Sequence, residues 1–208
     1  MSDFERVDAL WRIEREKMRN GYTRIAGVDE AGRGPLAGPV CVAAVILPPD
    51  AYLEGIDDSK KLSEKNKNRL FDEIRKVAVC YNIVLIHNDE IDRLNILGAT
   101  FKGMCESVNG LSEKPDFVLV DGNMVRGMSI PHECIVKGDS KSISIAAASI
   151  LAKVTRDRYM DSLGEEYAVY GFKKHKGYPT KAHYEALSKY GASDIHRKSF
   201  NLKIGIGG

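Results

Sequence analysis

The feature that most constrains the fold is a pair of apolar segments joined by a turn rich in glycine and proline. Residues 22–29 (YTRIAGVD) predict a strand, and residues 40–47 (VCVAAVIL) predict a second, buried strand. The intervening EAGRGPLAGP contains the residue types that favour turns. The sequence therefore predicts a long hairpin within a sheet.

Further strands and helices follow this hairpin in alternation. Ser63, and Asn88 or Asp89, are suited to begin helices, because short polar side chains accept hydrogen bonds from a first helical turn. We expect strands at residues 77–86, 117–120 and 130–136, and helices at residues 63–77, 88–110, 142–163 and 181–190. Alternating strands and helices around one apolar sheet predict an α/β fold, and the hairpin favours a mixed sheet over a wholly parallel one.

Composition narrows the class of protein. The chain has 208 residues, of which 43% are hydrophobic and 29% charged, enough for one globular core. Its 31 basic and 29 acidic side chains leave a net charge of +2, which excludes a histone-like polycation and an acidic disordered activator. The four cysteines have neither the density of a disulfide scaffold nor the CxxC pairs of a zinc site. We therefore expect reduced thiols and a cytoplasmic location.

The two ends of the chain predict helices outside the central sheet. Residues 1–20 alternate charged and apolar positions at helical spacing, which predicts a leading surface helix. They contain no signal-peptide core, and no run of 18 apolar residues occurs, so we expect neither secretion nor contact with a membrane. We expect a single domain over residues 1–208, with a helical C-terminal extension at about residues 165–200.

Acidic residues stand where two predicted strands end. Asp29 and Glu30 end the first strand, and Asp121 ends the strand at residues 117–120. Carboxylates beside buried strands are costly unless a partner neutralises them, and converging like charges demand raised pKa values or bound cations. Oxygen ligands favour magnesium or manganese. Taken alone, Asp121 followed by Gly122 is also an ordinary turn pair.

A fourth acid, Asp157, lies on the predicted helix at residues 142–163. It shares a helical stripe with Ser149 and Lys153, which predicts that the helix directs Asp157 into a water-filled site. The arginines on either side of Asp157 make a surface ion pair the alternative. Four carboxylates suit two divalent ions, Mn²⁺ or Mg²⁺, about 3.5–4 Å apart, which activate water and stabilise the leaving oxygen in phosphodiester hydrolysis.

The turn after Glu30 contains Gly32, Arg33 and Gly34. Glycine lets a backbone amide approach a ligand without a Cβ in the way, and a guanidinium binds a phosphate through two hydrogen bonds. The segment has neither GxxxxGK[ST] nor GxGxxG spacing, so it is not a nucleotide-binding loop of those kinds. On its own, the GRG triplet favours a plain turn.

The complete segment 27–40, GVDEAGRGPLAGPV, closely resembles the signature of ribonuclease HII, the type 2 ribonuclease H of bacteria. Further blocks resemble that family in the same order over about residues 22–200. They are DSKKLS (58–63), VLVDGN (118–123), VKGDSKS (136–142), AAASILAKVTRDR (146–158), KHKGYPT (174–180) and IHRKSF (195–200). Residues 1–21 and 201–208 match no block, and the short tail has no clear sliding-clamp motif.

The resemblance implies a monomeric endoribonuclease with a ribonuclease H-like fold. Similar proteins cut the RNA strand of RNA/DNA hybrids and nick duplex DNA on the 5′ side of single embedded ribonucleotides, leaving 3′-hydroxyl and 5′-phosphate ends. The implied catalytic residues and metal ligands are Asp29, Glu30, Asp121 and Asp157. The backbone of Gly32, Arg33 and Gly34 is implied to contact the ribose 2′-hydroxyl, and Tyr178 to sense the junction.

Basic residues near Tyr178 suit a track for substrate phosphates. Lys174 and Lys176 are the predicted substrate-binding lysines, with a solvated surface loop as the alternative. Two other functions stay open. Another two-metal nuclease of this fold would need the acids but not the GRG turn with Tyr178. A non-catalytic nucleic-acid-binding module would lack converging acids, because uncompensated carboxylates repel phosphate.

Overall fold

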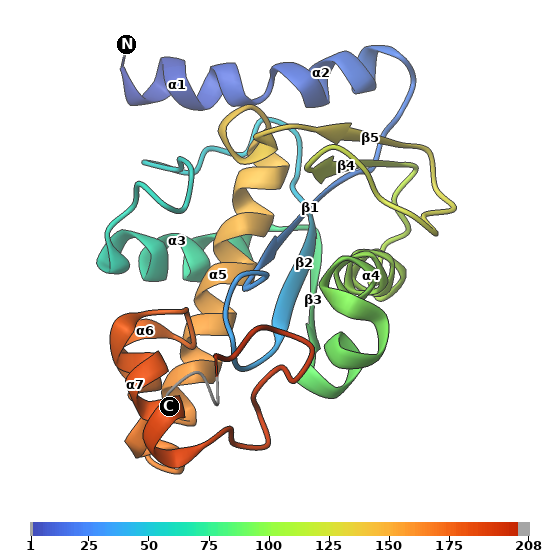
Figure 1. The fold of residues 1–208 in the computed structure, drawn as a ribbon. Helices are drawn as coiled ribbons and strands as arrows, with labels where there is room; N and C mark the ends of the chain where they lie inside the picture. The colour runs from blue at the N-terminus through green and yellow to red at the C-terminus, as the bar shows by residue number, and fades with distance from the viewer. Residues whose placement is uncertain (1, 204–208) are drawn as a thin grey trace.

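The structure is a computed structural model that describes residues 2–203. Its centre is a sheet in the order β3-β2-β1-β4-β5 (Figure 1), formed by β1 (Ile25–Ala31), β2 (Val40–Ile46), β3 (Cys80–Ile86), β4 (Phe117–Asp121) and β5 (His132–Ile135). β1, β2 and β3 pair antiparallel, whereas β4 pairs parallel with both β1 and β5. The predicted long hairpin and mixed sheet are confirmed.

Helices and short 3₁₀ turns surround the sheet. They are α1 (Asp3–Leu10), α2 (Arg12–Arg19), α3 (Glu64–Val77), α4 (Asn88–Asn109), η1 (Gly138–Ser140), α5 (Ile143–Ser162), η2 (Ala168–Tyr170), α6 (Phe172–His175) and α7 (Lys181–Tyr190). The predicted leading helix is divided at Trp11, whose indole is buried and donates to the carbonyl of Ala51 over 3.0 Å. Lys174, one of the basic residues near Tyr178, lies on α6 rather than in a loop.

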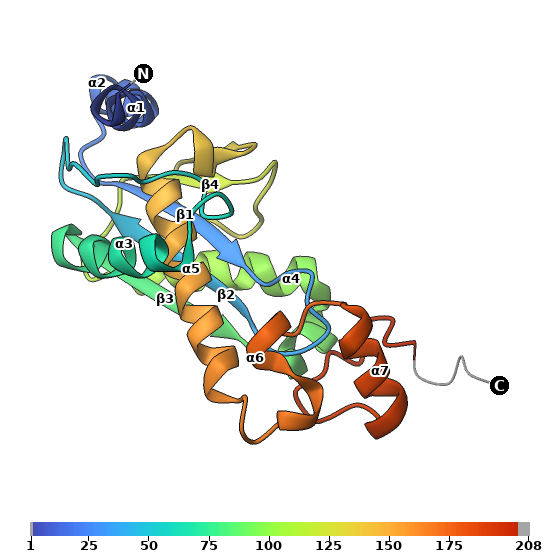
Figure 2. The same cartoon turned by 90° about the vertical axis from the view of Figure 1, so that its left-hand side faces the viewer.

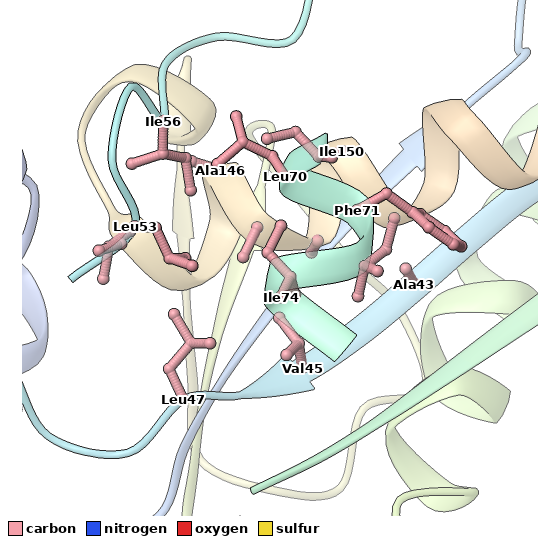
Figure 3. Close-up of a cluster of buried hydrophobic side chains, with 14 of the residues drawn as sticks. Ala43, Val45, Leu47, Leu53, Ile56, Leu70, Phe71, Ile74, Ala146 and Ile150 are labelled. Carbon is pink, nitrogen blue, oxygen red and sulfur yellow. The ribbon is translucent and has the colours of Figure 1, made fainter. Parts of the chain in front are cut away.

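One face of the sheet is covered by α3 and α5. Ser63 begins α3 by accepting a hydrogen bond from the Asn66 amide, as its position predicted. The apolar stripe of α3 then packs on β2 and α5 (Figure 3), where Leu70, Ile74 and Ile150 are fully buried. Alternate residues of β2 point to this face, as the period of two in a strand requires.

The other face is covered by α4. The β2 residues that point away from α3 contact Phe101 and Met104 of α4 in a second apolar cluster, together with β4. The chain after α5 forms a third cluster around Phe172, in which α6 and α7 pack against Leu36 and Ala37 of the hairpin turn. In Figure 2 this C-terminal part lies at the opposite end of the molecule from α1 and α2. The end of the sheet at which the hairpin turn joins β1 and β2 therefore faces the C-terminal helices.

The closest contact between layers sets the position of the site. α5 crosses β1 at Gly27, where a Cβ would lie 2.1 Å from the backbone carbonyl carbon of Ser144. Only glycine leaves room for this approach. Because Asp29 lies two residues further along β1 and on the same face as Gly27, it comes beside Ser149 of α5. The local packing of the strand thus brings a buried acid next to the helix.

Candidate active site

Three predicted acids meet at one edge of the sheet. Asp29 and Glu30 lie near the end of β1, and Asp121 is the last residue of its parallel neighbour β4. The register pairs Val28 with Val120, so Asp29 and Asp121 follow at the same level of the two strands. The structure thus brings Asp29, Glu30 and Asp121 together, as the strand ends predicted.

Burial and like charge dominate the electrostatics of these acids. Asp29 is only 5% exposed, and its carboxylate accepts hydrogen bonds from the Glu30 amide over 2.7 Å and from the Ser149 hydroxyl. Burial raises the pKa of Asp29 well above its usual value, and the charges of Glu30 and Asp121 raise it further. Burial also raises the pKa of Glu30, against the opposing charge of Arg33, whose guanidinium lies 3.3 Å from Glu30 Oε1.

A fourth acid that the sequence analysis did not select lies beside this group. Asp139 is on η1, directly after β5, and is 4% exposed. The backbone N–H of the preceding Gly138 donates to Asp121 Oδ1 over 2.6 Å, and Lys60 Nζ lies 3.4 Å from Asp139 Oδ2. Burial raises the pKa of Asp139, Lys60 opposes this, and Asp121 is among the acids that raise it. The sequence signal was weak: Asp139 comes shortly after the strand predicted at residues 130–136, and only the pairing of β5 with β4 brings it beside Asp121.

Asp157 lies elsewhere on α5. Its carboxylate pairs with Lys153 Nζ at 2.8 Å, and it does not line the cavity formed by Asp29, Glu30 and Asp121. The helical stripe is present, but Ser149 and Lys153 are the members that reach the cavity. Eight residues of α-helix span about 12 Å, so Asp157 lies too far along the axis from Ser149 to join Asp29. The structure therefore does not bring Asp157 into this cavity.

Asp29, Glu30 and Asp121, but not Asp139, line a cavity of about 390 Å³. Four parts of the chain besides the two strand ends contribute to its wall: the hairpin turn, the loop before α3 with the start of that helix, α5, and the loop between α6 and α7. The lining residues are Asp29, Glu30, Ala31, Gly32, Arg33, Ser59, Lys60, Lys67, Asp121, Ser149, Lys153 and Tyr178. The cavity therefore combines acidic, basic and glycine-turn surfaces.

The glycine turn and Tyr178 face each other across this cavity. A Cβ built on Gly34 would lie 3.8 Å from Tyr178 Cε1, an ordinary contact distance. The Tyr178 ring is 38% exposed, with Lys153 Nζ 5.9 Å and the Arg156 guanidinium 5.7 Å from its centroid. Gly32 has a φ of +94°, which favours glycine. The predicted pairing of the turn with Tyr178 is thus present in space.

The two lysines predicted from the basic loop do not line the cavity. Lys174 is exposed on α6. Lys176 has a half-buried side chain whose ammonium binds Asp161 and donates to the Lys173 carbonyl over 2.8 Å. The lysines that do line the cavity are Lys60, Lys67 and Lys153. Local sequence identified a basic region but not which ammonium groups face the acids.

The donor chemistry of the site fits divalent cations. Glu30 Oε2 is buried and has no hydrogen-bond partner, and Asp29 is buried against two like charges, so both would gain from a cation. Carboxylate oxygens are the ligands that Mg²⁺ and Mn²⁺ prefer. Within residues 2–203, no three acidic, histidine or cysteine side chains already stand as a ready-made metal cage. The residues that would hold the ions are therefore the buried acids at the edge of the sheet.

Comparison with known proteins identifies the family. The family model for ribonuclease HII matches residues 26–203, which include the cavity and all of the sheet except Ile25. The chain belongs to the ribonuclease HII family. It is 53% identical over 200 residues to ribonuclease HII of Clostridioides difficile strain 630, covering 96% of this chain and 78% of that protein. It is 48% identical over 194 residues to ribonuclease HII of Caldicellulosiruptor saccharolyticus, covering 93% and 95%.

Solved structures agree with this membership. Ribonuclease H2 from Pyrococcus horikoshii has a TM-score of 0.74 at 27% identity, covering 86% of this chain and 95% of that one. The ribonuclease HII of Archaeoglobus fulgidus, determined in complex with PCNA, gives the same values. A Bst ribonuclease HIII in complex with Mn²⁺ has a TM-score of 0.66 at 22% identity, covering 86% and 67%, and shows the shared fold. The predicted ribonuclease H-like fold is confirmed.

Family membership establishes the class of activity. The chain is an endoribonuclease of the ribonuclease H type that acts on RNA/DNA hybrids and depends on divalent metal ions. This favours the ribonuclease over a different two-metal nuclease or a non-catalytic binding module. No helix within the described part of the chain has the length and apolar character needed to cross a membrane.

Proposed function

We propose that this ribonuclease, besides cutting the RNA strand of hybrids, nicks duplex DNA on the 5′ side of a single embedded ribonucleotide and leaves 3′-hydroxyl and 5′-phosphate ends. One observation carries the proposal: Asp29, Glu30 and Asp121 line the same cavity as Gly32, Arg33 and Tyr178. When the scissile phosphate lies against the acids, the ribose of the same nucleotide lies beside the turn. The site can therefore recognise the sugar and cleave the bond at one nucleotide.

Asp29, Glu30, Asp121 and Asp139 are the acids to which we assign catalysis and metal binding. Asp139 takes the place of Asp157, because Asp139 is buried beside Asp121 whereas Asp157 pairs with Lys153. These acids would hold two divalent ions, Mn²⁺ or Mg²⁺, which would supply an activated water and stabilise charge on the leaving 3′-oxygen. The acids hold this positive charge at a fixed place relative to the scissile phosphate.

Sugar recognition is assigned to the turn and the tyrosine. The amides of Gly32, Arg33 and Gly34 contact the ribose, and the exposed face of Tyr178 packs on the nucleotide that follows the cleavage site. Support comes from the approach of Gly34 to Tyr178 and from the absence of a side chain on Gly34. A polar site that expects a 2′-hydroxyl and meets a deoxyribose is left with unpaired donors, which makes the deoxyribonucleotide a poor substrate.

Substrate phosphates are held by the cavity lysines. Lys60 and Lys153 line the wall beside the acids, and the Lys60 side chain is 81% exposed, so its ammonium is accessible to a phosphate. Lys174 is proposed as an outer phosphate contact, because it is exposed on α6 near Tyr178. Lys176 is already held by Asp161, which supports a role in fixing the loop rather than in binding substrate.

We further propose one cytoplasmic, monomeric domain over residues 1–208. A single domain is supported by the packing of the C-terminal helices against the hairpin turn, which joins both ends of the sequence to one core. A clamp complex is known for the A. fulgidus relative. The predicted lack of a clamp motif at residues 201–208 falls mostly on residues 204–208, outside the described residues.

The proposal is tested with a labelled DNA duplex that carries one ribonucleotide. The duplex is incubated with the protein in the presence of Mg²⁺, Mn²⁺ or a chelator, and the product ends are mapped. We expect one nick on the 5′ side of the ribonucleotide, with either metal and not with the chelator. Asp121→Asn protein prepared in the same way controls for contaminating nucleases. No metal-dependent nick, or a nick on the 3′ side, would overturn the proposal.

A further inference from the structure

Two arginines are buried behind the glycine turn without a carboxylate partner. Arg156 on α5 is 1% exposed and Arg197 after α7 is 0% exposed. Neither forms an ion pair within residues 2–203, since the nearby Asp157 is bound to Lys153. A buried charge is costly unless hydrogen bonds compensate it. These cations therefore need another source of stabilisation.

Backbone carbonyls provide that stabilisation. Arg197 Nη2, Nη1 and Nε donate to the carbonyls of Gly32 (2.6 Å), Arg33 (2.9 Å) and Gly38 (2.9 Å). Arg156 Nη2, Nε and Nη1 donate to the carbonyls of Ala37 (3.2 Å), Pro39 (2.9 Å) and Lys176 (3.1 Å). Five of these six acceptors belong to the hairpin turn, and the sixth belongs to the loop that carries Tyr178.

The direction of these carbonyls fixes the direction of the amides. In a trans peptide the C=O of one residue and the N–H of the next point to opposite sides. Because Arg197 binds the carbonyls of Gly32 and Arg33, the N–H groups of Arg33 and Gly34 point away from it, toward the cavity side. Neither N–H donates to a protein acceptor among the described residues. Both amides are thus oriented and available to a ligand.

Arg156 joins the turn to the tyrosine loop. It binds carbonyls in both segments, and its guanidinium lies 5.7 Å from the centroid of the Tyr178 ring. A Cβ at Gly32 would lie 2.0 Å from Arg156 Nε, so the guanidinium packs directly against the turn. The Leu36 amide also donates to the Gly177 carbonyl over 2.8 Å. The two segments form one packed unit around Arg156.

We propose that Arg156 and Arg197 are positioning residues for ribose recognition: by holding backbone carbonyls, they set the Arg33 and Gly34 amides and the Tyr178 ring around one 2′-hydroxyl. The inference rests on the function proposed for the turn and Tyr178. Lysine cannot substitute at either position, because an ammonium lacks the planar set of donors that binds three carbonyls at once.

The test compares Arg156→Lys and Arg197→Lys with Arg158→Lys. Arg158 is a matched control on the same helix, since it lies over the Phe71 ring and donates to Asn68 at the surface. Single-turnover nicking of the one-ribonucleotide duplex is measured at a temperature where each variant is folded. We expect a loss of at least about 30-fold in the first two variants and less than twofold in the control. Glutamine at either position is the second variant if a lysine variant does not fold.

A second readout separates positioning from a general loss of stability. In the Asp121→Asn background, which leaves the substrate uncut, ¹H–¹⁵N NMR follows the Arg33 and Gly34 amides during titration with the one-ribonucleotide duplex and its all-deoxy counterpart. We expect the two duplexes to shift these amides differently, and Arg197→Lys to abolish the difference. Full nicking rates in the lysine variants, or an unchanged amide response in Arg197→Lys, would overturn the inference alone. Identical responses to both duplexes without any arginine change would instead overturn the ribose-recognition function.

Discussion

The backbone N–H of Gly138 donates to Asp121 Oδ1 over 2.6 Å, so the turn that carries Asp139 is attached to the end of β4. This bond places a buried acid from the parallel edge of the sheet beside the acids of β1 and β4. It supports the proposal that Asp139, rather than Asp157 on α5, is the fourth acid of the group. Variants of Asp139 and Asp157 can therefore test which residue is the fourth acid.

Asp139→Asn and Asp157→Asn should differ sharply in activity. We expect Asp139→Asn to lower the single-turnover rate by about 100-fold or more, because loss of a metal ligand removes several kcal/mol of transition-state stabilisation. Asp157→Asn should lower it by less than about tenfold, since it removes only the partner of Lys153. The check is cleavage of the one-ribonucleotide duplex at saturating Mn²⁺. A larger loss of rate in Asp157→Asn than in Asp139→Asn would show that Asp157 is the fourth ligand.

Gly34→Ala should lower the nicking rate, whereas Gly32→Ala should lower the stability of the fold. An alanine methyl at position 34 meets only Tyr178 at 3.8 Å, so we expect normal thermal stability and a lower nicking rate. At position 32 the backbone has a φ of +94° and the methyl would lie 2.0 Å from Arg156 Nε, so stability itself should fall, by more than about 1 kcal/mol. Melting curves and nicking rates measured on the same samples separate the two. Full activity in Gly34→Ala would remove the turn from sugar recognition.

Salt dependence tests the assignment of the lysines. Each phosphate contact adds about one to the magnitude of the slope of log affinity against log salt concentration. We therefore expect Lys60→Ala and Lys174→Ala each to reduce the slope by about one. Lys176→Ala should leave it unchanged, because its ammonium is held by Asp161. Fluorescence anisotropy with a labelled hybrid, without metal, measures the slopes. A reduced slope in Lys176→Ala alone would reassign the contact.

Acid should weaken the C-terminal part of the fold through two buried histidines. His183 and His196 face each other, with their Nε2 atoms 3.0 Å apart. Burial lowers the pKa of both, that of His196 to about 4, with His183 contributing to the latter. In the unfolded chain both histidines have the ordinary pKa of about 6.5, so the unfolded chain binds more protons than the folded one as pH falls below 6.5. The stability present above pH 6.5 is then lost toward pH 4, by about 2 kcal/mol for His196 between pH 7.5 and 5.

The control for this pH dependence is His196→Gln. Burial raises the pKa of Asp29, which changes stability with pH in the opposite direction, so the wild-type slope alone does not isolate the histidines. Urea unfolding of both proteins at pH 7.5, 6 and 5 gives the difference. We expect the variant to lose less stability than the wild type over this interval. Equal losses in the two proteins would show that His196 does not titrate differently on unfolding.

Local patterns predicted the elements well. The helix at residues 181–190 has the bounds observed for α7, because Thr180 accepts a hydrogen bond from the His183 amide and Gly191 ends the helix. The hairpin and the acids at its end also followed from the apolar runs and the residues that interrupt them. Period and capping are properties of neighbouring residues, so one sequence carries them.

The remaining features depend on contacts between distant segments. Asp139 has no periodic pattern around it, and its place follows only once β5 pairs parallel with β4. Helical spacing put Asp157 on the correct stripe but gave no account of how far along α5 the cavity extends. The sequence shows Arg197 only as a basic residue of the IHRKSF block, whereas the structure buries it against carbonyls of the hairpin turn. The sequence shows which residues are charged, but it does not show which of them are buried in the fold.

We propose that this ribonuclease selects a nucleotide for cleavage by its 2′-hydroxyl. The most direct measurement is single-turnover cleavage of two duplexes that differ only in that hydroxyl, with Mn²⁺ present and product ends mapped. We expect cleavage on the 5′ side of the ribonucleotide, and a rate at least about 10⁴-fold above that of the deoxy duplex. Tyr178→Ala should reduce this ratio. Cleavage of the deoxy duplex within tenfold of the ribonucleotide duplex would contradict the account.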